Sequence, residues 1–489
     1  GVTGSGKTEV YLKLAQTTVE SGKSVLVLVP EIALTPQVAT RFRRAFGGRV
    51  ALWHSRMTKA EKGWTWQQLK KGKYSVVVGA RSAIFAPLYN LGLIIVDEEQ
   101  ESSYKQDNPA PRYHARDVAM VRGKQAGATV LLTSATPCLE SYYNALQNKF
   151  TLLKLTKRYG KSNYPAVELV DMKKEYSADG SSLLSKSLVQ GIDDRLKNSE
   201  QVIILQNRRG YSRVHQCLDC GEIKKCKHCS VALTFHRTDN NLHCHYCESI
   251  EAPASKCNEC NAENLIFAGS GTQRVEDVLQ QQFPKSKILR MDMDTVRGKD
   301  SHMKILKKFA NGKADILLGT QMIAKGLDFE NVTLVGVINA DSGLFFPDFR
   351  AGERVFQLIY QVAGRAGRGD RAGEVFAQTY SPESAAIQFA RHSDLDGFAE
   401  EELRQRKEFG YPPFRHLVRH LFRSRNDSKA AFFAEQWSKR LKAKLSPSEI
   451  DVRGPSPAPM EKIKDHYRFH LWYFMQSVSK SLPAILDLR

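Results

Sequence analysis

The chain begins with GVTGSGKT, which has the composition and spacing of a phosphate-binding loop. It matches G-x-x-x-x-G-K-[ST], in which glycines let backbone N–H groups converge on phosphate oxygens. In such a loop the ammonium of Lys7 reaches the terminal phosphates and the hydroxyl of Thr8 binds Mg²⁺. A chance glycine-rich turn is the plain alternative. The pattern predicts a site for ATP and Mg²⁺, with backbone contributions from Gly1, Gly4 and Gly6.

An acidic motif supports this interpretation. The apolar run LGLIIV is followed by Asp97 and Glu98, where a buried strand would end. One carboxylate there could hold the metal ion, and the other could polarise the attacking water. Alone, such a strand end is no more typical of a metal site than of a surface turn. Together, the loop and the acidic motif predict a nucleotide hydrolase.

A third polar segment carries arginines. The stretch QVAGRAGRGDRAG contains Gln361, Arg365 and Arg368, and the two arginines have the spacing of side chains on one face of a helix. Arginines brought to a phosphate from a second lobe stabilise the charge of the transition state. Their loss when the lobes separate would couple hydrolysis to motion. A solvated basic helix is the alternative, and the other two motifs argue against it.

Cysteines form a separate cluster. Of nine cysteines, eight make four C-x-x-C pairs within residues 217–260. A C-x-x-C turn presents two thiolates to one tetrahedral ion, so the four turns predict two Zn²⁺ ions, and disulfides are disfavoured in the cytosol. Spacing leaves open which turns combine, and nearby histidines could replace a thiolate. Outside the cluster, Cys138 is expected to be a small buried packing residue. The pairs are Cys217/Cys220, Cys226/Cys229, Cys244/Cys247 and Cys257/Cys260.

These side chains need elements that hold them in place. Short β-branched runs alternate with segments of helical spacing, which is typical of parallel sheets covered by helices on both faces. Two groups of runs predict two α/β lobes, with helices expected over 7–20 and 35–46. The runs lie at 24–30, 74–80, 91–99 and 128–137 in the first group and at 201–207, 286–292, 314–320 and 332–340 in the second.

The composition limits the class of protein. Lys and Arg number 72 against 52 Asp and Glu, which leaves a net charge of +20 in 489 residues. Such a surplus favours a polyanionic partner, nucleic acid above all, although solubility alone would also explain it. No run approaches the roughly 20 apolar residues that span a bilayer, so we expect no membrane association and a cytoplasmic location. Because no strand precedes the phosphate loop, we expect the chain to be a piece of a longer protein.

With these motifs in this order, the sequence resembles the superfamily 2 helicases and, more narrowly, the replication-restart helicases of the PriA family. The resemblance extends over most of the chain through strings such as VPEIALTPQ, DEEQESSYKQ, GTQMIAKGLDF and DFRAGERVFQLIYQVAGRAGR. It implies two RecA-like lobes that drive an ATP-dependent DNA helicase of 3′ to 5′ polarity. Such a helicase acts at stalled or recombined forks and reloads the replicative helicase. Members of the family carry an N-terminal DNA-binding region ahead of the phosphate loop.

The resemblance also assigns roles to individual residues. It places Gly326 and Asp328 at the nucleotide. It favours a nested zinc scheme, in which the two outer C-x-x-C pairs share one ion and the two inner pairs share the other. Residues 101–117 resemble an aromatic-rich loop that links single-strand contact to ATP hydrolysis, because aromatic rings stack on bases. Packing in the core is the alternative for its rings, which are Tyr104, Tyr113 and His114.

One position departs from the family pattern. Relatives read Asp-Glu-Glu-His where this chain reads DEEQ, which ends in Gln100. In related helicases the fourth residue touches the SAT loop, which is residues 134–136 in this chain. We therefore expect Gln100 to keep a contact with Ser134 or Thr136. Glutamine donates and accepts hydrogen bonds as histidine does, but it cannot become cationic.

Four regions follow from this interpretation. The segments RRGYSR at 208–213 and KKCKHCSVALTFHR at 224–237 are basic with interleaved aromatic residues, which suits DNA or a protein partner. The resemblance implies that the insertion contacts other primosome proteins, and that the C-terminal domain contacts DNA and single-strand-binding protein. We expect a monomer. The regions are 1–155 for the first lobe, 156–212 and 266–392 for the second, 213–265 for a double-zinc insertion, and 393–489 for a smaller, incomplete C-terminal α+β domain.

Two other functions stay open at this level. Helicase motifs encode movement, so a DNA translocase that does not separate strands fits them as well. A scaffold that recruits replication proteins and has a decayed motor is the second alternative, and the intact motif residues argue against it.

Overall fold

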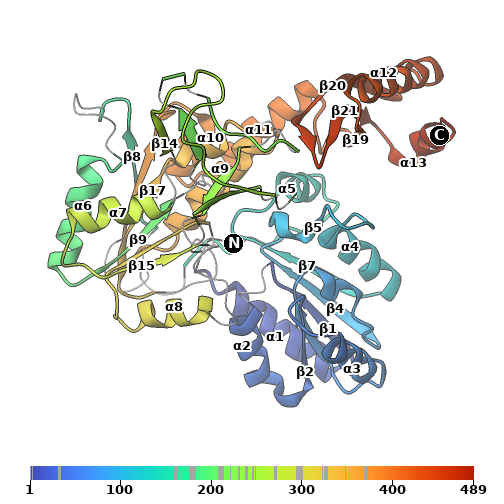
Figure 1. Ribbon diagram of the computed structural model, residues 1–489. Helices are drawn as coiled ribbons and strands as arrows, with labels where there is room; N and C mark the ends of the chain where they lie inside the picture. Colours follow the sequence, from blue (N-terminus) through green and yellow to red (C-terminus); the bar gives the residue numbers. More distant parts are fainter. Residues whose placement is uncertain are drawn as a thin grey trace.

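Two α/β lobes lie beside each other in the computed structural model, with a further unit at the C-terminal end of the chain (Figure 1). The structure describes residues 2–488 except 3, 31–34, 159–163, 176–182, 207–213, 218, 221, 229–231, 237–239, 245–246, 248, 269–271, 293–300, 322, 324–328, 347 and 368–372.

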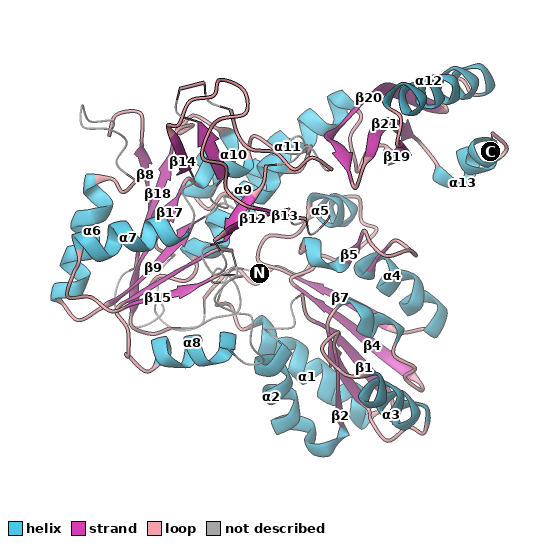
Figure 2. Cartoon of the chain, viewed as in Figure 1, coloured by secondary structure: helices cyan, strands magenta, loops and turns pink. Residues whose placement is uncertain are grey.

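Lobe 1 is built on a five-stranded parallel sheet with the order β2-β3-β1-β4-β7. Helices cover both faces (Figure 2). On one face Tyr11 of α1 and Phe42 of α2 pack in the core, and on the other face Leu69 of α3 and Ala119 of α4 do so. The strands are β1 Ser24–Leu28, β2 Val50–Trp53, β3 Val76–Gly79, β4 Leu91–Asp97 and β7 Thr129–Thr133, and the helices are α1 Lys7–Glu20, α2 Thr35–Phe46, α3 Lys59–Lys70, α4 Ala115–Ala126 and α5 Leu139–Leu146.

Lobe 2 has a six-stranded parallel sheet with the order β15-β16-β9-β17-β18-β8. Its central strands β9 and β17 are buried along their whole length, which places the core of the lobe around them. The strands are β8 Ala166–Asp171, β9 Gln201–Gln206, β15 Ile288–Met291, β16 Ile316–Gly319, β17 Val332–Ile338 and β18 Glu374–Thr379, and the helices are α6 Lys186–Lys197, α7 Thr272–Gln282, α8 Ser301–Ala310, α9 Ala351–Ala363 and α10 Ala385–Arg391.

Every apolar run that the sequence marked as a strand is a strand of one of these sheets, and the helices expected over 7–20 and 35–46 have those bounds. Three strands, β2, β8 and β18, were not expected. β8 lies at the edge of its sheet, and its side chains alternate between buried and more exposed positions. A search for continuous apolar runs does not detect such a strand, because only one of its faces is apolar.

The cysteine-rich insertion leaves and re-enters lobe 2 through a pair of antiparallel strands, β10 Val214–Cys217 and β14 Leu265–Ala268. Because β14 continues to Ala268, the boundary expected at residue 265 lies inside a strand. Between these strands is a small antiparallel sheet of β11 Thr234–His236, β12 Asn241–His243 and β13 Ile250–Glu251.

The C-terminal unit is an antiparallel sheet with the order β19-β21-β20, on which helix α12 packs. Helix α11 was expected in this unit, but its core contacts are with lobe 2. Phe398 of α11 stacks on Phe356 of α9, with ring centroids 4.3 Å apart. In the part of the chain that is described, no helix combines the length and apolarity that a membrane span requires. The elements are α11 Leu395–Phe409, β19 His416–Ser424, α12 Asp427–Lys444, β20 Ile450–Ile463, β21 His466–Met475 and α13 Val478–Leu486.

Candidate nucleotide-binding site and metal centre

The phosphate loop lies at the start of α1. Gly4 and Gly6 adopt left-handed backbone conformations, with φ of 77° and 81°, which residues with a Cβ rarely adopt. Gly6 is the N-cap of α1, so the N-terminus of this helix, which favours an anion, lies next to the loop. The ammonium of Lys7 donates to the carbonyl of Val2, 3.2 Å away, and stays within the loop. Thr8 is half-buried, and Gly1 lies outside the described residues.

Asp97 ends β4 in a half-buried position. Its carboxylate accepts hydrogen bonds from the hydroxyls of Thr133 at 2.7 Å and Tyr11 at 3.4 Å. Burial and the neighbouring charge of Glu98 raise the pKa of Asp97 to about 6. A divalent cation bound here would favour the charged carboxylate, so the residue fits a Mg²⁺ ligand. Glu98 has a φ of 48°, a rare conformation for a residue other than glycine and one that concentrates at functional sites.

A chain of hydrogen bonds, here called the polar relay, runs from the acidic motif to lobe 2. Gln100 donates to Glu98 Oε2 at 2.7 Å and accepts from Ser134 Oγ at 2.6 Å. Ser134 Oγ accepts from the N–H of Thr136 at 2.9 Å, and Thr136 Oγ1 accepts from Gln361 Nε2 at 3.4 Å. The contact expected between Gln100 and Ser134 is therefore present. The relay joins the strand end of lobe 1 to helix α9 of lobe 2.

Helix α9 carries Gln361 to this position and ends before Arg365. The last helical residue is Ala363 and Gly364 is the C-cap, so Arg365 lies in the turn that follows the helix. The sequence had predicted a position on a helical face for Arg365. The low helix propensity of the glycines in this segment accounts for the difference. The described part of the chain leaves out Arg368, Gly326 and Asp328.

The segment after the acidic motif, which resembles a loop in the sequence, has some regular structure. It contains a 3₁₀ turn, Ser102–Tyr104, and two short antiparallel strands, β5 Lys105–Gln106 and β6 Tyr113–His114. Tyr104 is fully buried, and its hydroxyl donates to the carbonyl of Asp97 at 2.7 Å. Its ring packs in the core and cannot stack on a base, so the packing alternative applies to this residue.

Tyr113 and His114 are half-buried. The ring of Tyr113 makes an edge contact with Phe85, with centroids 5.0 Å apart, and the guanidinium of Arg81 lies 6.0 Å from the same ring. Burial and the nearby charge of Arg116 lower the pKa of His114 to about 4, so its imidazole is neutral near pH 7. Of the two tyrosines, Tyr113 is the one that is not fully buried, and a cation lies beside its ring.

Sequence reasoning missed Arg158, in the connection between the lobes. Its NH2 group donates to the carbonyl of Gly364 at 2.8 Å, and its Nε lies 3.5 Å from the place that a Cβ on Gly4 would occupy. The same connection is bonded to the phosphate loop through Val2 N and Leu155 O, 3.0 Å apart. A cation therefore lies between the phosphate loop and the end of α9. No motif marks it, because it belongs to an irregular segment that only the fold places there.

Cys138 is buried at the start of α5, as expected of a packing residue. Its backbone N–H donates to Glu99 Oε1 at 2.7 Å. The other oxygen of Glu99 pairs with Arg116 at 3.1 Å and accepts from the hydroxyl of Ser141 at 3.0 Å. The third acidic residue of the motif therefore anchors α5, a role that its place next to Asp97 and Glu98 concealed.

The cysteine sulfurs gather in two clusters. Cys217 Sγ and Cys260 Sγ are 3.6 Å apart, far beyond a disulfide bond of about 2.05 Å. The distance is close to the edge of about 3.8 Å that four Zn–S bonds of about 2.3 Å give a tetrahedron, so the donors fit Zn²⁺. Cys229 lies outside the described residues. Within each cluster the sulfurs lie within 4.8 Å of one another, and the clusters are Cys217, Cys220, Cys257 and Cys260 in one case and Cys226, Cys244 and Cys247 in the other.

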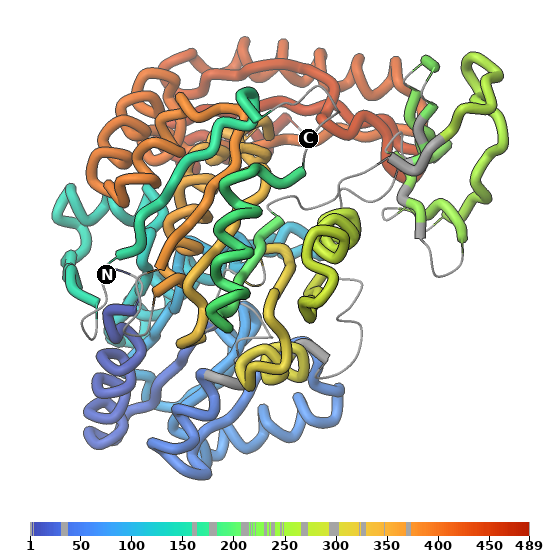
Figure 3. The backbone as a smooth tube through the Cα atoms, turned by 90° about the vertical axis from the view of Figure 1, so that its left-hand side faces the viewer, coloured from blue at the N-terminus to red at the C-terminus, as the bar shows by residue number. Residues whose placement is uncertain are grey.

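The hairpin of β20 and β21 reaches the insertion from the C-terminal unit (Figure 3). At its tip, the backbone N–H of Asp465 donates to the carbonyl of His228 at 2.8 Å, and the two side chains meet at 2.7 Å. Lys462 Nζ donates to the carbonyl of Lys227 at 3.1 Å, and Ile463 packs on the small apolar core of the insertion. Segments far apart in the sequence thus hold the metal-binding part of the insertion in place.

Family models match four parts of the chain. Residues 1–144 match the DEAD/DEAH box helicase family, and residues 248–370 match the helicase conserved C-terminal domain. Residues 226–251 match the PriA DNA helicase Cys-rich region domain, and residues 407–487 match the primosomal protein N C-terminal domain.

Curated relatives align with nearly the whole chain. Replication restart protein PriA of Bacillus subtilis (strain 168) is 46% identical over 469 residues, which cover 96% of this chain and 58% of the relative. The protein of the same name from Treponema pallidum (strain Nichols) is 43% identical over 472 residues, with coverage of 96% and 70%. That of Rickettsia felis is 40% identical over 473 residues, with coverage of 96% and 72%. The chain thus spans less than two thirds of the Bacillus relative. With the motif geometry, the two parallel-sheet lobes and the cysteine clusters described above, these matches show that the chain belongs to the PriA family of replication restart proteins.

Proposed function

We propose that this chain is an ATP-dependent DNA helicase of 3′ to 5′ polarity, which acts at stalled or recombined replication forks and promotes primosome assembly. The observation that carries the proposal is the polar relay, which links the acidic motif of lobe 1 to Gln361 of lobe 2. A motor of two lobes needs such a link, because hydrolysis at one lobe must change the position of the other. The net charge of +20 favours binding to the phosphate backbone of DNA.

Each motif residue has one task in this proposal. Lys7 and the N–H groups of the phosphate loop bind the phosphates, and Thr8 and Asp97 would hold Mg²⁺, which neutralises phosphate charge when bound. Glu98 orients the attacking water. Side chains from lobe 2 complete the pocket and stabilise the charge of the transition state. Gln361, Arg365 and Arg368 supply these side chains, and Gly326 and Asp328 contact the nucleotide.

We assign two Zn²⁺ ions to the insertion in a nested scheme, and the two sulfur clusters support this assignment. A closed site of four thiolates leaves no coordination position for a substrate, so each ion has a structural role and its binding energy is folding energy. One ion is assigned to Cys217, Cys220, Cys257 and Cys260, and the other to Cys226, Cys229, Cys244 and Cys247.

The insertion, with its basic segment 224–237, and the C-terminal unit are the surfaces that we assign to partners. These partners are forked and single-stranded DNA, single-strand-binding protein and other primosome proteins, with the chain acting as a monomer in the cytoplasm. Tyr113 is the ring of the aromatic segment best suited to contact bases, since Tyr104 is buried.

A DNA translocase that does not separate strands is the second candidate, because the polar relay would serve movement equally well. The test measures ATP hydrolysis with and without single-stranded DNA, and strand displacement on duplexes with a 3′ or a 5′ single-stranded tail. Stimulated hydrolysis with displacement that needs the 3′ tail supports the helicase. Stimulated hydrolysis without displacement favours the translocase, and the absence of hydrolysis favours a scaffold.

A further inference from the structure

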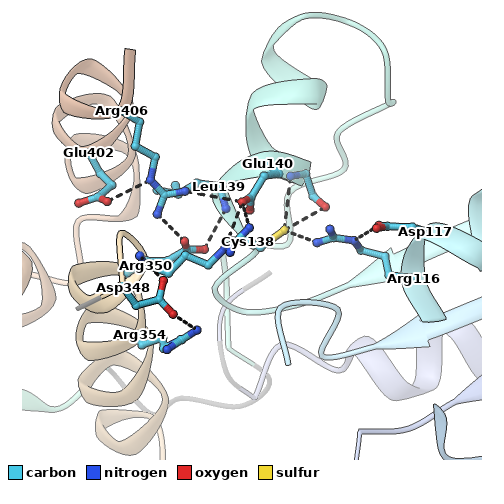
Figure 4. A network of polar contacts seen from close by, with 12 residues as sticks. Arg116, Asp117, Cys138, Leu139, Glu140, Asp348, Arg350, Arg354, Glu402 and Arg406 are labelled. Atoms are coloured by element: carbon cyan, nitrogen blue, oxygen red, sulfur yellow. Dashed lines mark hydrogen bonds and ion pairs between the residues drawn. The ribbon is translucent and has the colours of Figure 1, made fainter. Parts of the chain in front are cut away.

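Arg406, on α11, is among the largest fully buried side chains in the described part of the protein. A buried guanidinium is costly unless its donors are paired. Figure 4 shows Arg406 facing residues of α5 in lobe 1, of α9 in lobe 2 and of its own helix. One cation thus stands where three parts of the molecule meet.

Two of its nitrogen atoms are paired. NH2 donates to Glu353 Oε2 of α9 at 2.7 Å, and Nε donates to Glu402 Oε1 of α11 at 3.1 Å. The second oxygen of Glu353 accepts from the backbone N–H of Leu139, at the start of α5, at 3.0 Å. A single carboxylate therefore ties lobe 1 to lobe 2 and to α11.

The third nitrogen atom, NH1 of Arg406, has no hydrogen-bond partner among the described residues. It faces Glu140 of α5, whose Oε1 lies 3.8 Å away. Glu140 is held by Arg350, whose Nε donates to the same oxygen at 3.1 Å. Two guanidiniums thus share one carboxylate of lobe 1, and a closer approach of α5 would supply the hydrogen bond that NH1 lacks.

The contacts of Arg406 with Glu140 of α5 and Glu353 of α9 are here called the junction. The charge of Arg406 acts on the carboxylates on both sides of it. Burial raises the pKa of Glu353, and the attraction of Arg406 offsets only part of the effect. Burial acts in the same direction on Glu140, but Arg350 and Arg406 outweigh it, so the pKa of Glu140 is lowered. Without Arg406, a buried carboxylate of lobe 2 would face a carboxylate of lobe 1 with one cation fewer between them.

The junction adjoins the polar relay. Gln357 lies one turn after Glu353 on α9, and its amide donates to Glu353 Oε1 at 3.2 Å and to the carbonyl of Thr136 at 3.4 Å. One turn further, Gln361 donates to the hydroxyl of the same Thr136. Residues four apart lie on one face of a helix, so Glu353, Gln357 and Gln361 form a continuous row against the SAT loop.

We propose that Arg406 is a positioning residue for ATP hydrolysis, which sets the distance between α5 and α9 and thereby holds Gln361 against Thr136. The proposal rests on the ATPase activity proposed above. A shift of α11, the helix that precedes the C-terminal sheet, would therefore change the polar relay through the guanidinium of Arg406.

The test replaces Arg406 by methionine, which keeps a long side chain and removes the charge. Arg404→Met is the matched control, since Arg404 is exposed on the same helix and pairs with Glu401 of that helix at 2.8 Å. We expect R406M to lower kcat of DNA-stimulated hydrolysis about tenfold or more, because small misplacements of catalytic groups have effects of this size. KM for ATP should change less than about twofold, since the phosphate loop is untouched. R404M should behave like the unmodified chain.

Loss of stability must be separated from loss of positioning, because R406M leaves Glu353 as a buried charge. The double variant E353Q/R406M is neutral at the junction and keeps an amide oxygen for the N–H of Leu139. We expect its thermal melting to return toward that of the unmodified chain while kcat stays low. Recovery of kcat together with melting, or an R406M with the kcat of R404M, would overturn the proposal. Absence of ATP hydrolysis in the unmodified chain would instead refute the proposed function, and this inference with it.

Discussion

At the scale of single residues, the polar relay depends on a side chain that donates and accepts at once. Gln100 accepts from Ser134 and donates to Glu98. A neutral imidazole at this position also has one donor and one acceptor, but a protonated one has two donors and cannot accept from Ser134. Glutamine therefore keeps the relay intact at a pH where histidine would break it.

We expect Gln100→His to leave basal ATP hydrolysis unchanged, because the roles proposed for Asp97 and Glu98, metal binding and water orientation, do not need residue 100. The stimulation of hydrolysis by single-stranded DNA should decline in the variant as the pH falls from about 8 to 6, since imidazole protonates around pH 6.5. The ratio of stimulated to basal rate should show no such decline in the unmodified chain. A large drop in the basal rate would place residue 100 in the chemistry and refute its role in coupling.

Lys7→Ala should abolish DNA-stimulated ATP hydrolysis and leave DNA binding largely intact, because Lys7 lies in the phosphate loop, whereas the surfaces proposed to bind DNA are the insertion and the C-terminal unit. Lys13→Ala is the matched control, since Lys13 is exposed on the same helix. Turnover assays and fluorescence anisotropy with labelled single-stranded DNA measure the two properties. Normal turnover by the Lys7 variant would contradict the assignment of the loop.

At the scale of elements, the described part of the insertion has too few buried apolar residues to fold on a core of its own. Its apolar cluster consists of Leu233, Phe235 and Leu242 with two cysteines, and its strands are short. Small domains of this kind need a bound metal ion or another stabilising cross-link. The cysteines are thus expected to supply through Zn²⁺ the stability that packing does not provide.

The purified chain should contain two zinc ions, and Cys226→Ser should release one of them and unfold part of the insertion. ATP hydrolysis should survive better than strand displacement, since none of the motifs proposed for the nucleotide site lies in the insertion. Metal analysis measures the ions, and Cys138→Ser is the control, because Cys138 lies away from both clusters and should leave two ions bound. One ion or none in the unmodified chain would refute the assignment of four pairs to two sites.

At the scale of the whole molecule, the C-terminal unit contacts the insertion that interrupts lobe 2. The chain leaves lobe 2 for the insertion, returns, continues through α11 to the C-terminal sheet, and from there the β20-β21 hairpin reaches the insertion again (Figure 3). The insertion is therefore restrained at its base by β10 and β14 and at its far side by the hairpin tip. Its position relative to the lobes depends on both restraints.

Ile463→Asp should free the insertion from the hairpin without removing its metal, because a charge cannot pack on the apolar core of the insertion. We expect faster amide hydrogen exchange in residues 241–244, with two zinc ions still bound. Glu461→Ala, an exposed change on the same strand, is the control. Unchanged exchange in the Ile463 variant would show that the hairpin contact does not hold the insertion.

The sequence by itself determined the features that depend on local spacing. Continuous apolar runs became the buried parallel strands, because a strand covered on both faces has no polar side. The glycines of the phosphate loop, the acidic strand end and the C-x-x-C turns were equally readable, since each needs particular residue types a few positions apart. The contact between Gln100 and Ser134 was expected from the resemblance to related helicases, which left Thr136 as the alternative partner.

Only the tertiary structure decided which polar and aromatic groups are buried, and against what. Tyr104 and Tyr113 lie in one short segment, yet the first is in the core and the second is partly open. No motif assigned a role to the side chains of Arg158, Glu353 and Arg406, because each takes its role from a partner brought near by packing of distant elements. The pairing energy of such a group depends on its burial and on its distances to other charges, and both arise only when the lobes and α11 meet.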